Sequence, residues 1–442
     1  MSQISVTTGG PKPEALAGAK LVERMTDAER ARARRVESVL PALREGARQA
    51  DARGEFHRPN VDALRDAGLL GLIVPEEYGG LGGGLRDLAA ATYALGTACP
   101  STALAYFFHC SSASRGLLAL EAIDAGLFGE AERGPVRAFA QKLLCKMGRD
   151  GRWLANFASE AVKTAASAVT IATEATRAPD GRGWILNGVK SYGCSTGVAD
   201  EYLVTAKLAG SQSAEGLALF FVQRDAPGVA ERARWDAIGM RGTATHGITL
   251  ADVAVRDAEA LALPGAFVRM MQMSRGSFVG NQLAATAVYV GAAQTVYDAS
   301  IDWLTRSKFE DTGRPLGESP MHQELVGRMT VDLETAHLWM RRQLELETSE
   351  PPLLPKPAVV RAWRLCKGEV CEAAFRVATG ALKAGGTGNT GNQGVIARGL
   401  RDLAMGLVQA FPAERGRLEV AKMVVSDHEQ ALFGVAAARS AS

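Results

Sequence analysis

A glycine-rich hexapeptide in the last quarter of the chain has the spacing of a phosphate-binding motif. It reads GTGNTG from Gly386 to Gly391 and fits the GxGxxG pattern, whose backbone amides hold the pyrophosphate of a dinucleotide. That chemistry needs a strand before the glycines and a helix after them. The preceding run, VCEAAFRVATGALKAG, has helical spacing instead. We therefore interpret the hexapeptide as a tight loop between two helices.

Cysteine and charge content argue against several kinds of site. The six cysteines, at positions 99, 110, 145, 194, 366 and 371, lack the paired spacing of metal ligands, so we expect reduced thiols and no zinc site. The 50 basic and 48 acidic residues form no basic stripe, which argues against a nucleic acid partner. No apolar run is long enough to cross a membrane and no export signal is evident, so we expect a cytoplasmic protein.

The elements that must position any site fall into three blocks. Short apolar runs broken by Asn-Gly, Thr-Gly and Arg-Gly turns predict strands within Trp184–Lys207 and Trp235–Val255, whereas the flanks have helical spacing. We predict an α+β multidomain protein with an N-terminal all-α domain, a middle antiparallel β-sandwich or β-barrel domain and a C-terminal four-helix bundle. The predicted bounds are 1–26 for a flexible N-terminus, 27–151 for the helical domain, 152–264 for the β domain and 265–442 for the bundle.

Amphipathic helices dominate the last block. The segment PPLLPKP at 351–357 separates two of them, because proline cannot continue a helix. Short links of this kind predict an antiparallel bundle. The four expected helices cover 281–306, 321–347, 358–382 and 395 onward.

Six short segments follow one another in an order that is informative as a set. They are VPEEYGGLGG from Val74, STALAYFFH from Ser101, NGVKSYGCSTGVADEYLV from Asn187, GMRGTATHGITLADVAV from Gly239, RSKF from Arg306 with HQ from His322, and GGTG from Gly385 with RD from Arg401. In this order they resemble the acyl-CoA dehydrogenase superfamily of flavoenzymes, and the resemblance covers most of the chain. It implies the three-part fold, a bound FAD with FMN as the alternative, and a homo-oligomer that is either a dimer or a tetramer.

The resemblance assigns one group of residues to the phosphate and adenine end of the cofactor. Arg306 would pair with the pyrophosphate, because a guanidinium is always ionised and fits phosphate geometry. Phe309 would pack against the adenine or ribose, Gln323 would hydrogen-bond the phosphates or adenine, and Gly385 and Gly386 would form the family's glycine turn. In the family these groups reach across a subunit interface. Taken singly, Arg306 could equally be a solvated helix-end cation and Phe309 a core residue.

A second group resembles the family's contacts around the isoalloxazine ring. Ser159 stands where a flavin-contacting Ser or Thr is usual, and Tyr192 where a Trp or Phe is common. Cys194 and Ser195 share the position of a ring-contacting Thr, with the register open by one residue. The alternatives are a core ring at Tyr192 and a turn hydroxyl at Ser195.

The sequence departs from the family where proton transfer is expected. Desaturation of an acyl thioester needs a carboxylate that takes the α-proton while the flavin accepts a hydride. At the two positions where the family places this Glu, the chain has Ala410 and Asn281, and neither can act as a base near neutral pH. The family's flexible glycine loop is also replaced, by SEAVKTAASAV from Ser159.

Two other residues are candidates for the missing catalytic group. Glu414, one turn beyond Ala410, could take the proton, although it could equally be a surface residue. His109 lies on the helix that faces the flavin pocket in the relatives, and its imidazole could donate a hydrogen bond or take a proton. Beside Phe107 and Phe108, the alternative for His109 is a core residue with satisfied ring nitrogens.

Three functions remain open at this point. The leading hypothesis is an FAD-dependent oxidation of an acyl group held as a thioester on coenzyme A or a carrier protein, with an electron-transfer partner. The alternative is a reduced-flavin-dependent monooxygenase of the same fold, which would act on an amine, a sulfur or an aromatic carbon and would need oxygen and a flavin reductase. The third is a flavin-binding protein without turnover.

Overall fold

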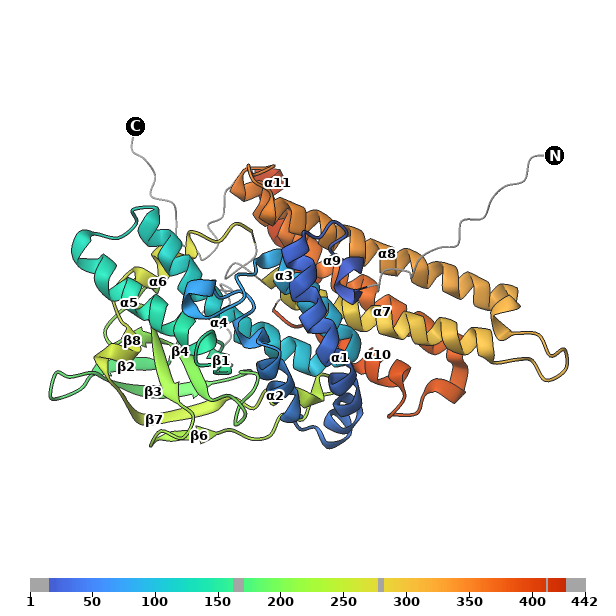
Figure 1. Cartoon of the computed structure of the whole chain (residues 1–442), viewed down its shortest axis with the longest axis horizontal. Coiled ribbons are helices and arrows are strands. Elements are labelled where there is room, and N and C mark those ends of the chain that lie inside the picture. Colours follow the sequence, from blue (N-terminus) through green and yellow to red (C-terminus); the bar gives the residue numbers. More distant parts are fainter. Residues whose placement is uncertain (1–15, 162–170, 277–281, 411, 427–442) are drawn as a thin grey trace.

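The computed structural model describes residues 16–161, 171–276, 282–410 and 412–426 of the chain. Figure 1 shows the β domain at one side of the molecule, the long bundle helices at the other, and the N-terminal helices between them. One hydrophobic core runs through all three parts, because it includes Leu43, Leu203 and Val288. The α+β architecture predicted from the sequence is confirmed.

The N-terminal part is a layer of helices with defined starts. The Thr26 and Glu29 side chains each accept a hydrogen bond from the other residue's backbone N–H, which forms a capping box. Pro100 occupies the first turn of the fourth helix, where its missing N–H leaves no bond unmade. The helices are α1 (Asp27–Arg53), α2 (Pro59–Asp66), α3 (Leu85–Ala98), α4 (Pro100–Asp124) and α5 (Glu130–Met147), with 3-10 helices η1 (Ala17–Lys20), η2 (Leu69–Gly71) and η3 (Glu76–Tyr78).

The β domain is one eight-stranded sheet. Its order is β6-β7-β3-β2-β4-β5-β8, and β1 pairs with β4 off this path. Most pairs are antiparallel, as predicted, but β4 runs parallel to both β1 and β2. The elements are β1 (Leu154–Phe157), β2 (Glu174–Arg177), β3 (Trp184–Lys190), β4 (Glu201–Leu208), η4 (Ala214–Gly216), β5 (Leu217–Gln223), β6 (Val229–Glu231), η5 (Arg241–Thr243), β7 (Ile248–Val255), η6 (Asp257–Glu259) and β8 (Ala260–Leu261).

The C-terminal part consists of long helices joined by short links. The glycine hexapeptide lies in the loop that follows the third long helix, as interpreted from the sequence. The helix expected from residue 395 onward is two helices, because Ala410 takes a left-handed φ of 65° and Pro412 follows. The elements are α6 (Ala266–Met271), α7 (Gln282–Arg306), η8 (Leu316–Glu318), α8 (Pro320–Thr348), α9 (Lys356–Gly385), η9 (Gly386–Asn389), α10 (Val395–Gly406) and α11 (Ala413–Ser426).

Helix α4 is the element that joins the three parts. It packs against α3 and α5 in its own layer, against β1 of the sheet and against α7 of the bundle. Nearly all of its side chains are buried, so α4 lacks the polar face of a surface helix. A site between the β domain and the bundle must therefore have α4 as one of its walls.

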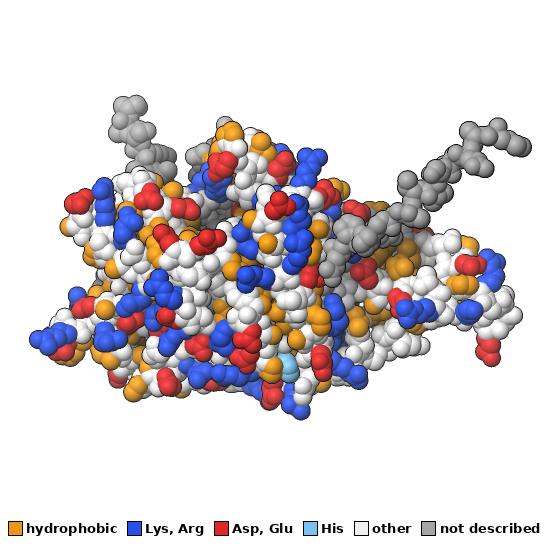
Figure 2. All heavy atoms as spheres, viewed as in Figure 1, with side chains coloured by type: hydrophobic (Ala, Val, Ile, Leu, Met, Phe, Trp, Pro, Cys, Tyr) orange, Lys and Arg blue, Asp and Glu red, His pale blue; other side chains and the backbone are white. Residues whose placement is uncertain are grey.

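The described part of the chain lacks the features of several other kinds of site. On the face drawn in Figure 2, basic and acidic side chains are interspersed over the helices and the sheet. None of the described helices is both long enough and apolar enough to cross a bilayer. Within the same residues, no group of three or more His, Cys, Asp or Glu side chains is placed to hold a metal ion.

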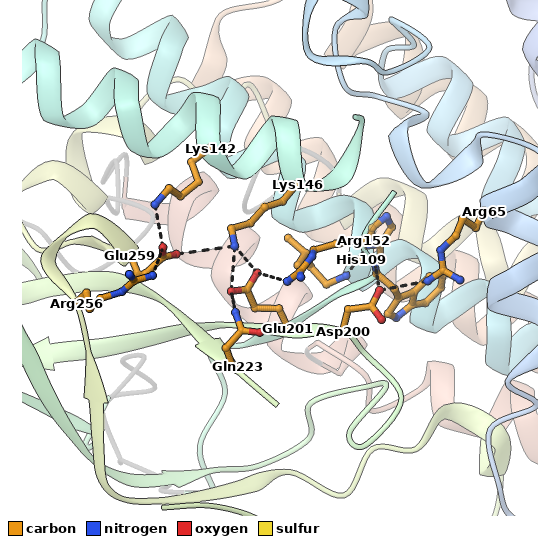
Figure 3. Close-up of polar contacts among 12 residues, drawn as sticks. Arg65, His109, Lys142, Lys146, Arg152, Asp200, Glu201, Gln223, Arg256 and Glu259 are labelled. Atoms are coloured by element: carbon orange, nitrogen blue, oxygen red, sulfur yellow. Dashed lines mark hydrogen bonds and ion pairs between the residues drawn. The ribbon is translucent and has the colours of Figure 1, made fainter. Parts of the chain in front are cut away.

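A buried charge cluster joins α5 to the sheet (Figure 3). The carboxylate of Glu201 is fully buried and accepts hydrogen bonds from Lys146 Nζ at 2.7 and 3.1 Å. Gln223 Nε2 donates to the same carboxylate, and Arg152 lies 3.7 Å from it. Because a buried carboxylate without partners is strongly unfavourable, this cluster fixes the position of α5 on the sheet.

We expect Lys146→Met to lower the free energy of unfolding by about 3 kcal/mol, because Glu201 then keeps only part of its compensation. Urea unfolding followed by circular dichroism measures the change. Lys142→Met is the matched control, since Lys142 and Glu259 are both partly exposed and such a pair contributes less than about 1 kcal/mol. Equal losses in the two variants would contradict the assignment.

Candidate active site

A cavity of about 630 Å³ lies where the N-terminal helices, the β domain and the bundle meet. Its size is typical of pockets for cofactors and small ligands. Twelve of the lining residues are apolar, aromatic or cysteine, and nine are polar or charged. The residues that line it are Leu104, Phe107, Phe108, Ser111, Arg115, Asn156, Ala158, Ser159, Glu160, Tyr192, Cys194, Trp235, Met240, Thr243, Thr245, Gln282, Tyr289, Met405, Val408, Gln409 and Ala410.

One wall is a stripe along helix α4. Leu104, Phe108, Ser111 and Arg115 follow one another at spacings of four, three and four residues, which places them on one helix face. Asn156 Nδ2, at the end of β1, donates to Ser111 Oγ at 2.9 Å. This bond fixes the start of the sheet against the helix at the edge of the cavity.

The opposite wall is built from two turns of the β domain. The turn after β3 and the turn before β7 are tied together by Ser195 N, which donates to Thr243 O at 2.9 Å, and by Thr196 N, which donates to Ala244 O at 2.9 Å. Tyr192 and Ala244 both adopt left-handed backbone conformations, with φ of 60° and 48°. Such conformations are unfavourable for these residue types and persist only where surrounding contacts hold them, as they do at binding sites.

Close backbone approach explains two glycines in these turns. A Cβ at Gly193 would lie 2.0 Å from the Phe157 ring, so the turn after β3 can take this path only with glycine. A Cβ at Gly239 would lie 1.9 Å from Arg401 O of α10. Beside it, Met240 N donates to the buried Asp402 carboxylate at 2.6 Å, which fastens the turn to the bundle.

The structure brings three of the predicted ring-contacting residues together. Ser159, Tyr192 and Cys194 all line the cavity, whereas Ser195 does not. The sequence left the register open between Cys194 and Ser195, and of these two residues Cys194 lines the cavity wall. Its Sγ lies 3.2 Å from Thr245 Oγ1, and burial raises the pKa of the thiol to about 12, so Cys194 is a neutral hydrogen-bonding group.

Glu160 is the one acidic side chain among the described residues of the cavity wall, and three donors engage its carboxylate. Lys190 Nζ donates to it at 2.7 Å, and the backbone amides of Ala172 and Thr173 donate at 2.6 and 3.0 Å. Burial alone would raise the pKa of Glu160, but Lys190 and Thr173 outweigh that effect and lower it. The carboxylate is therefore a poor proton acceptor.

The proposed positions of a catalytic base lie elsewhere or carry no base. Ala410 lines the cavity and presents a methyl group. Asn281 lies outside the described residues. Glu414 is on α11 with a side chain that is 74% exposed, lies 3.5 Å from Arg417, and is not among the cavity residues. Glu414 thus lies on the surface, outside the cavity, which agrees with the alternative that it is a surface residue.

His109 is held inside the core rather than in the cavity wall. Its Nε2 lies 2.9 Å from Leu70 O, and its Nδ1 accepts a hydrogen bond from Leu154 N at 3.0 Å. The ring also stacks on the Trp153 ring, with centroids 4.8 Å apart. Since backbone groups occupy both nitrogens, His109 has none to offer a substrate, which favours the core interpretation over the catalytic one.

The residues predicted to hold the far end of the cofactor lie away from the cavity of their own subunit. Arg306 ends α7, where its exposed side chain pairs with Asp302 at 2.7 Å, and Phe309 contacts the His322 ring in the connection to α8. Figure 1 shows this connection at the end of the molecule opposite to the β domain. Gln323 is exposed on the first turn of α8, and Gly385 and Gly386 end α9.

Several cavity residues were not found from the sequence. They are Arg115, Asn156, Thr243, Thr245 and Tyr289. The spacing of Leu104, Phe108, Ser111 and Arg115 was a usable signal, because it places the arginine on the same helix face as the segment that resembled the substrate helix. The two threonines and Tyr289 had no such signal, since their orientation depends on how the parts pack.

Comparison with known proteins identifies the family. Residues 26–120 match the acyl-CoA dehydrogenase N-terminal domain, 156–253 its middle domain and 283–411 its C-terminal domain. The chain therefore belongs to the acyl-CoA dehydrogenase family, and it is a flavin-dependent enzyme. The resemblance inferred from the six segments is confirmed.

Individual relatives differ in the reactions that their names describe. A probable acyl-CoA dehydrogenase, YngJ of Bacillus subtilis (strain 168), is 26% identical over 86% of this chain and 93% of its own length. An L-evernosamine nitrososynthase of Micromonospora sp. is 30% identical over 60% of this chain and 58% of its own. The FMN-bound dibenzothiophene monooxygenase TdsC from Paenibacillus sp. A11-2 has the same fold, with a TM-score of 0.75, 20% identity and coverage of 91% and 98%.

We expect His109 to make stability depend on pH. Burial lowers the pKa of His109 to about 4, below its usual value near 6.5, so the unfolded chain takes up a proton first as pH falls. This contribution is complete above about pH 6.5 and is lost progressively down to about pH 4, by about 3 kcal/mol in all. Urea unfolding of wild type and His109→Gln at pH 7 and pH 4.5 measures it. If the free energy of unfolding falls between pH 7 and pH 4.5 by as much in the variant as in wild type, His109 is not the source of the pH dependence.

Proposed function

We propose that the chain is a flavin-dependent monooxygenase, which uses oxygen and reduced flavin to oxidise a small molecule held in the cavity. The observation that carries this proposal is the engaged state of Glu160, the only acidic side chain among the described cavity residues. Desaturation of an acyl thioester requires a carboxylate that is free to take a proton from carbon. Monooxygenation does not.

The rest of the described wall offers no acidic replacement for Glu160. The phenol of Tyr289 stays protonated near neutral pH, because burial raises its pKa well above its ordinary value. This set of side chains suits a reaction in which the protein binds and shields its reactants without removing a proton from carbon.

We propose that the two β-domain turns hold the isoalloxazine ring. Tyr192 offers an aromatic face, and Ser159, Cys194 and Thr245 offer hydroxyl and thiol groups within one wall. The flavin would supply two electrons, with which one atom of O2 enters the substrate and the other leaves as water. Phe107 and its neighbours on α4 would exclude bulk water from the opposite side.

The residues predicted to hold the phosphate and adenine end support a proposal for the form of the cofactor. Arg306, Phe309 and Gln323 favour FAD, since FMN has no adenylate to hold. These residues lie at the α7–α8 connection, so we propose that they serve the cavity of a neighbouring copy in a dimer or tetramer. The FMN-bound form of TdsC supports FMN as the alternative. Reduced flavin would be provided by a separate flavin reductase.

Oxidation of an acyl thioester is the second candidate. The relation to YngJ favours it, because that relative matches most of the chain. It would need a proton acceptor outside the cavity wall that the structure describes, and an electron-transfer partner. A flavin-binding protein without turnover is the third candidate.

The first test separates these reactions with the flavin-loaded protein. We expect butyryl-CoA added without oxygen to leave the flavin oxidised, because the described wall of the cavity offers no free carboxylate. With oxygen, NADH and a flavin reductase, we expect transfer of one atom from labelled oxygen to an aromatic probe such as indole, detected by mass spectrometry. Stoichiometric bleaching by butyryl-CoA would instead establish thioester oxidation. If neither bleaching nor oxygen transfer is observed, the result favours the third candidate, a flavin-binding protein without turnover.

The second test concerns the cofactor. We expect Arg306→Ala to weaken flavin binding about tenfold to a hundredfold, because a charge-assisted hydrogen bond contributes about 1.5–3 kcal/mol. Flavin content after dialysis, with circular dichroism as a check on folding, gives the answer. Arg328→Ala is the matched control, since Arg328 is similarly exposed and pairs with Glu324 on α8. Unchanged flavin content in Arg306→Ala would remove this residue from the cofactor site.

A further inference from the structure

We infer that Arg115 binds an anionic group of the carboxylate class on the substrate, inside the cavity. The Arg115 side chain lines the cavity from helix α4, and the residue is only 3% exposed. Its Nε and Nη1 donors have no hydrogen-bond partner among the residues that the structure describes. The inference rests on the proposed function, because it names the class of molecule that this cavity takes.

A buried guanidinium without partners is strongly unfavourable. Arginine inside proteins is normally paired with a carboxylate or satisfied by several acceptors, since water is no longer available to solvate the charge. Burial lowers the pKa of Arg115 to about 10, so the group remains a cation near neutral pH. A buried cation without hydrogen-bond partners points to a ligand that supplies the missing acceptors.

The described residues of the cavity wall provide no counter-ion for Arg115. Glu160, the acidic side chain of the wall, is engaged by Lys190 at 2.7 Å. Two further polar atoms of the wall, Asn156 Oδ1 and Tyr289 OH, also lack partners among the described residues. The cavity therefore holds one cation and two neutral polar groups that await a ligand, a pattern that suits a negatively charged molecule with polar substituents.

The position of Arg115 favours the substrate over the flavin as the source of the anion. The candidate ring contacts Tyr192 and Cys194 lie on the β-domain wall, whereas Arg115 lies at the end of the α4 stripe, about 16 Å along the helix from Leu104. The candidate for the cofactor's phosphates, Arg306, is at the distant end of α7. Because a guanidinium presents parallel N–H donors that match the two oxygens of a carboxylate, a planar carboxylate is the anion that fits best.

The test compares probes that differ only in charge. Benzoate and benzamide have the same shape, as do glutaryl-CoA and the analogue in which its terminal carboxylate is an amide. We expect the flavin-loaded protein to bind one or both charged probes at least tenfold more tightly than the neutral partners, as measured by calorimetry. In Arg115→Met we expect this ratio to fall to about one while flavin content is unchanged. Arg256→Met, in which an exposed arginine is replaced, should keep the wild-type ratio.

Three results would overturn the inference. The first is equal affinity of the wild-type protein for the charged and neutral probes, or no binding of either. The second is an unchanged ratio of the two affinities in Arg115→Met. The third is loss of flavin from Arg115→Met, which would assign the arginine to the cofactor. Should Arg115→Met fail to fold, Arg115→Lys serves instead. Its single ammonium should reduce the preference for the charged probe without abolishing it, and an unchanged preference would count against the inference. Charge selectivity together with bleaching by butyryl-CoA would overturn the monooxygenase proposal and leave this inference standing.

Discussion

The packing of helix α4 against three partners at once is the constraint on which the rest of the structure depends. The helix touches α5, β1 and α7, so a rotation about its axis would disturb all three parts. His109 fixes that rotation, because its two nitrogens engage Leu70 on one side and Leu154 on the other. With the helix fixed in this way, Ser111 and Arg115 face the cavity, and the wall is already formed before any ligand arrives.

The charges of the cavity follow from that arrangement and differ from those expected of a dehydrogenase. A desaturating enzyme needs a free negative group beside the substrate, but here the methyl of Ala410 faces the cavity and the Glu160 carboxylate is neutralised by Lys190. Among the described residues of the wall, Arg115 carries a positive charge whose Nε and Nη1 donors have no hydrogen-bond partner. This distribution of charge supports the proposals of an anionic substrate and of a reaction without removal of a proton from carbon.

The sequence predicted the larger features better than the details of the site. Helical spacing and turn residues were enough for the three-part fold, because burial in each part follows a regular period. The family segments also located Tyr192 and Cys194, which do lie together in the wall. Local pattern could not distinguish a satisfied His109 from a catalytic one, since the answer lies in backbone atoms about 40 residues away along the chain. It also missed Arg115, whose significance is the lack of a partner in three dimensions.

The separation between the cavity and the α7–α8 connection has a consequence for the behaviour of the protein in solution. If Arg306 completes the site of a neighbouring copy, an isolated subunit contains only part of its cofactor site. Release of flavin and dissociation of the oligomer into subunits would then be linked equilibria, in which each process favours the other. The concentration of available flavin would then also set how much of the protein is assembled.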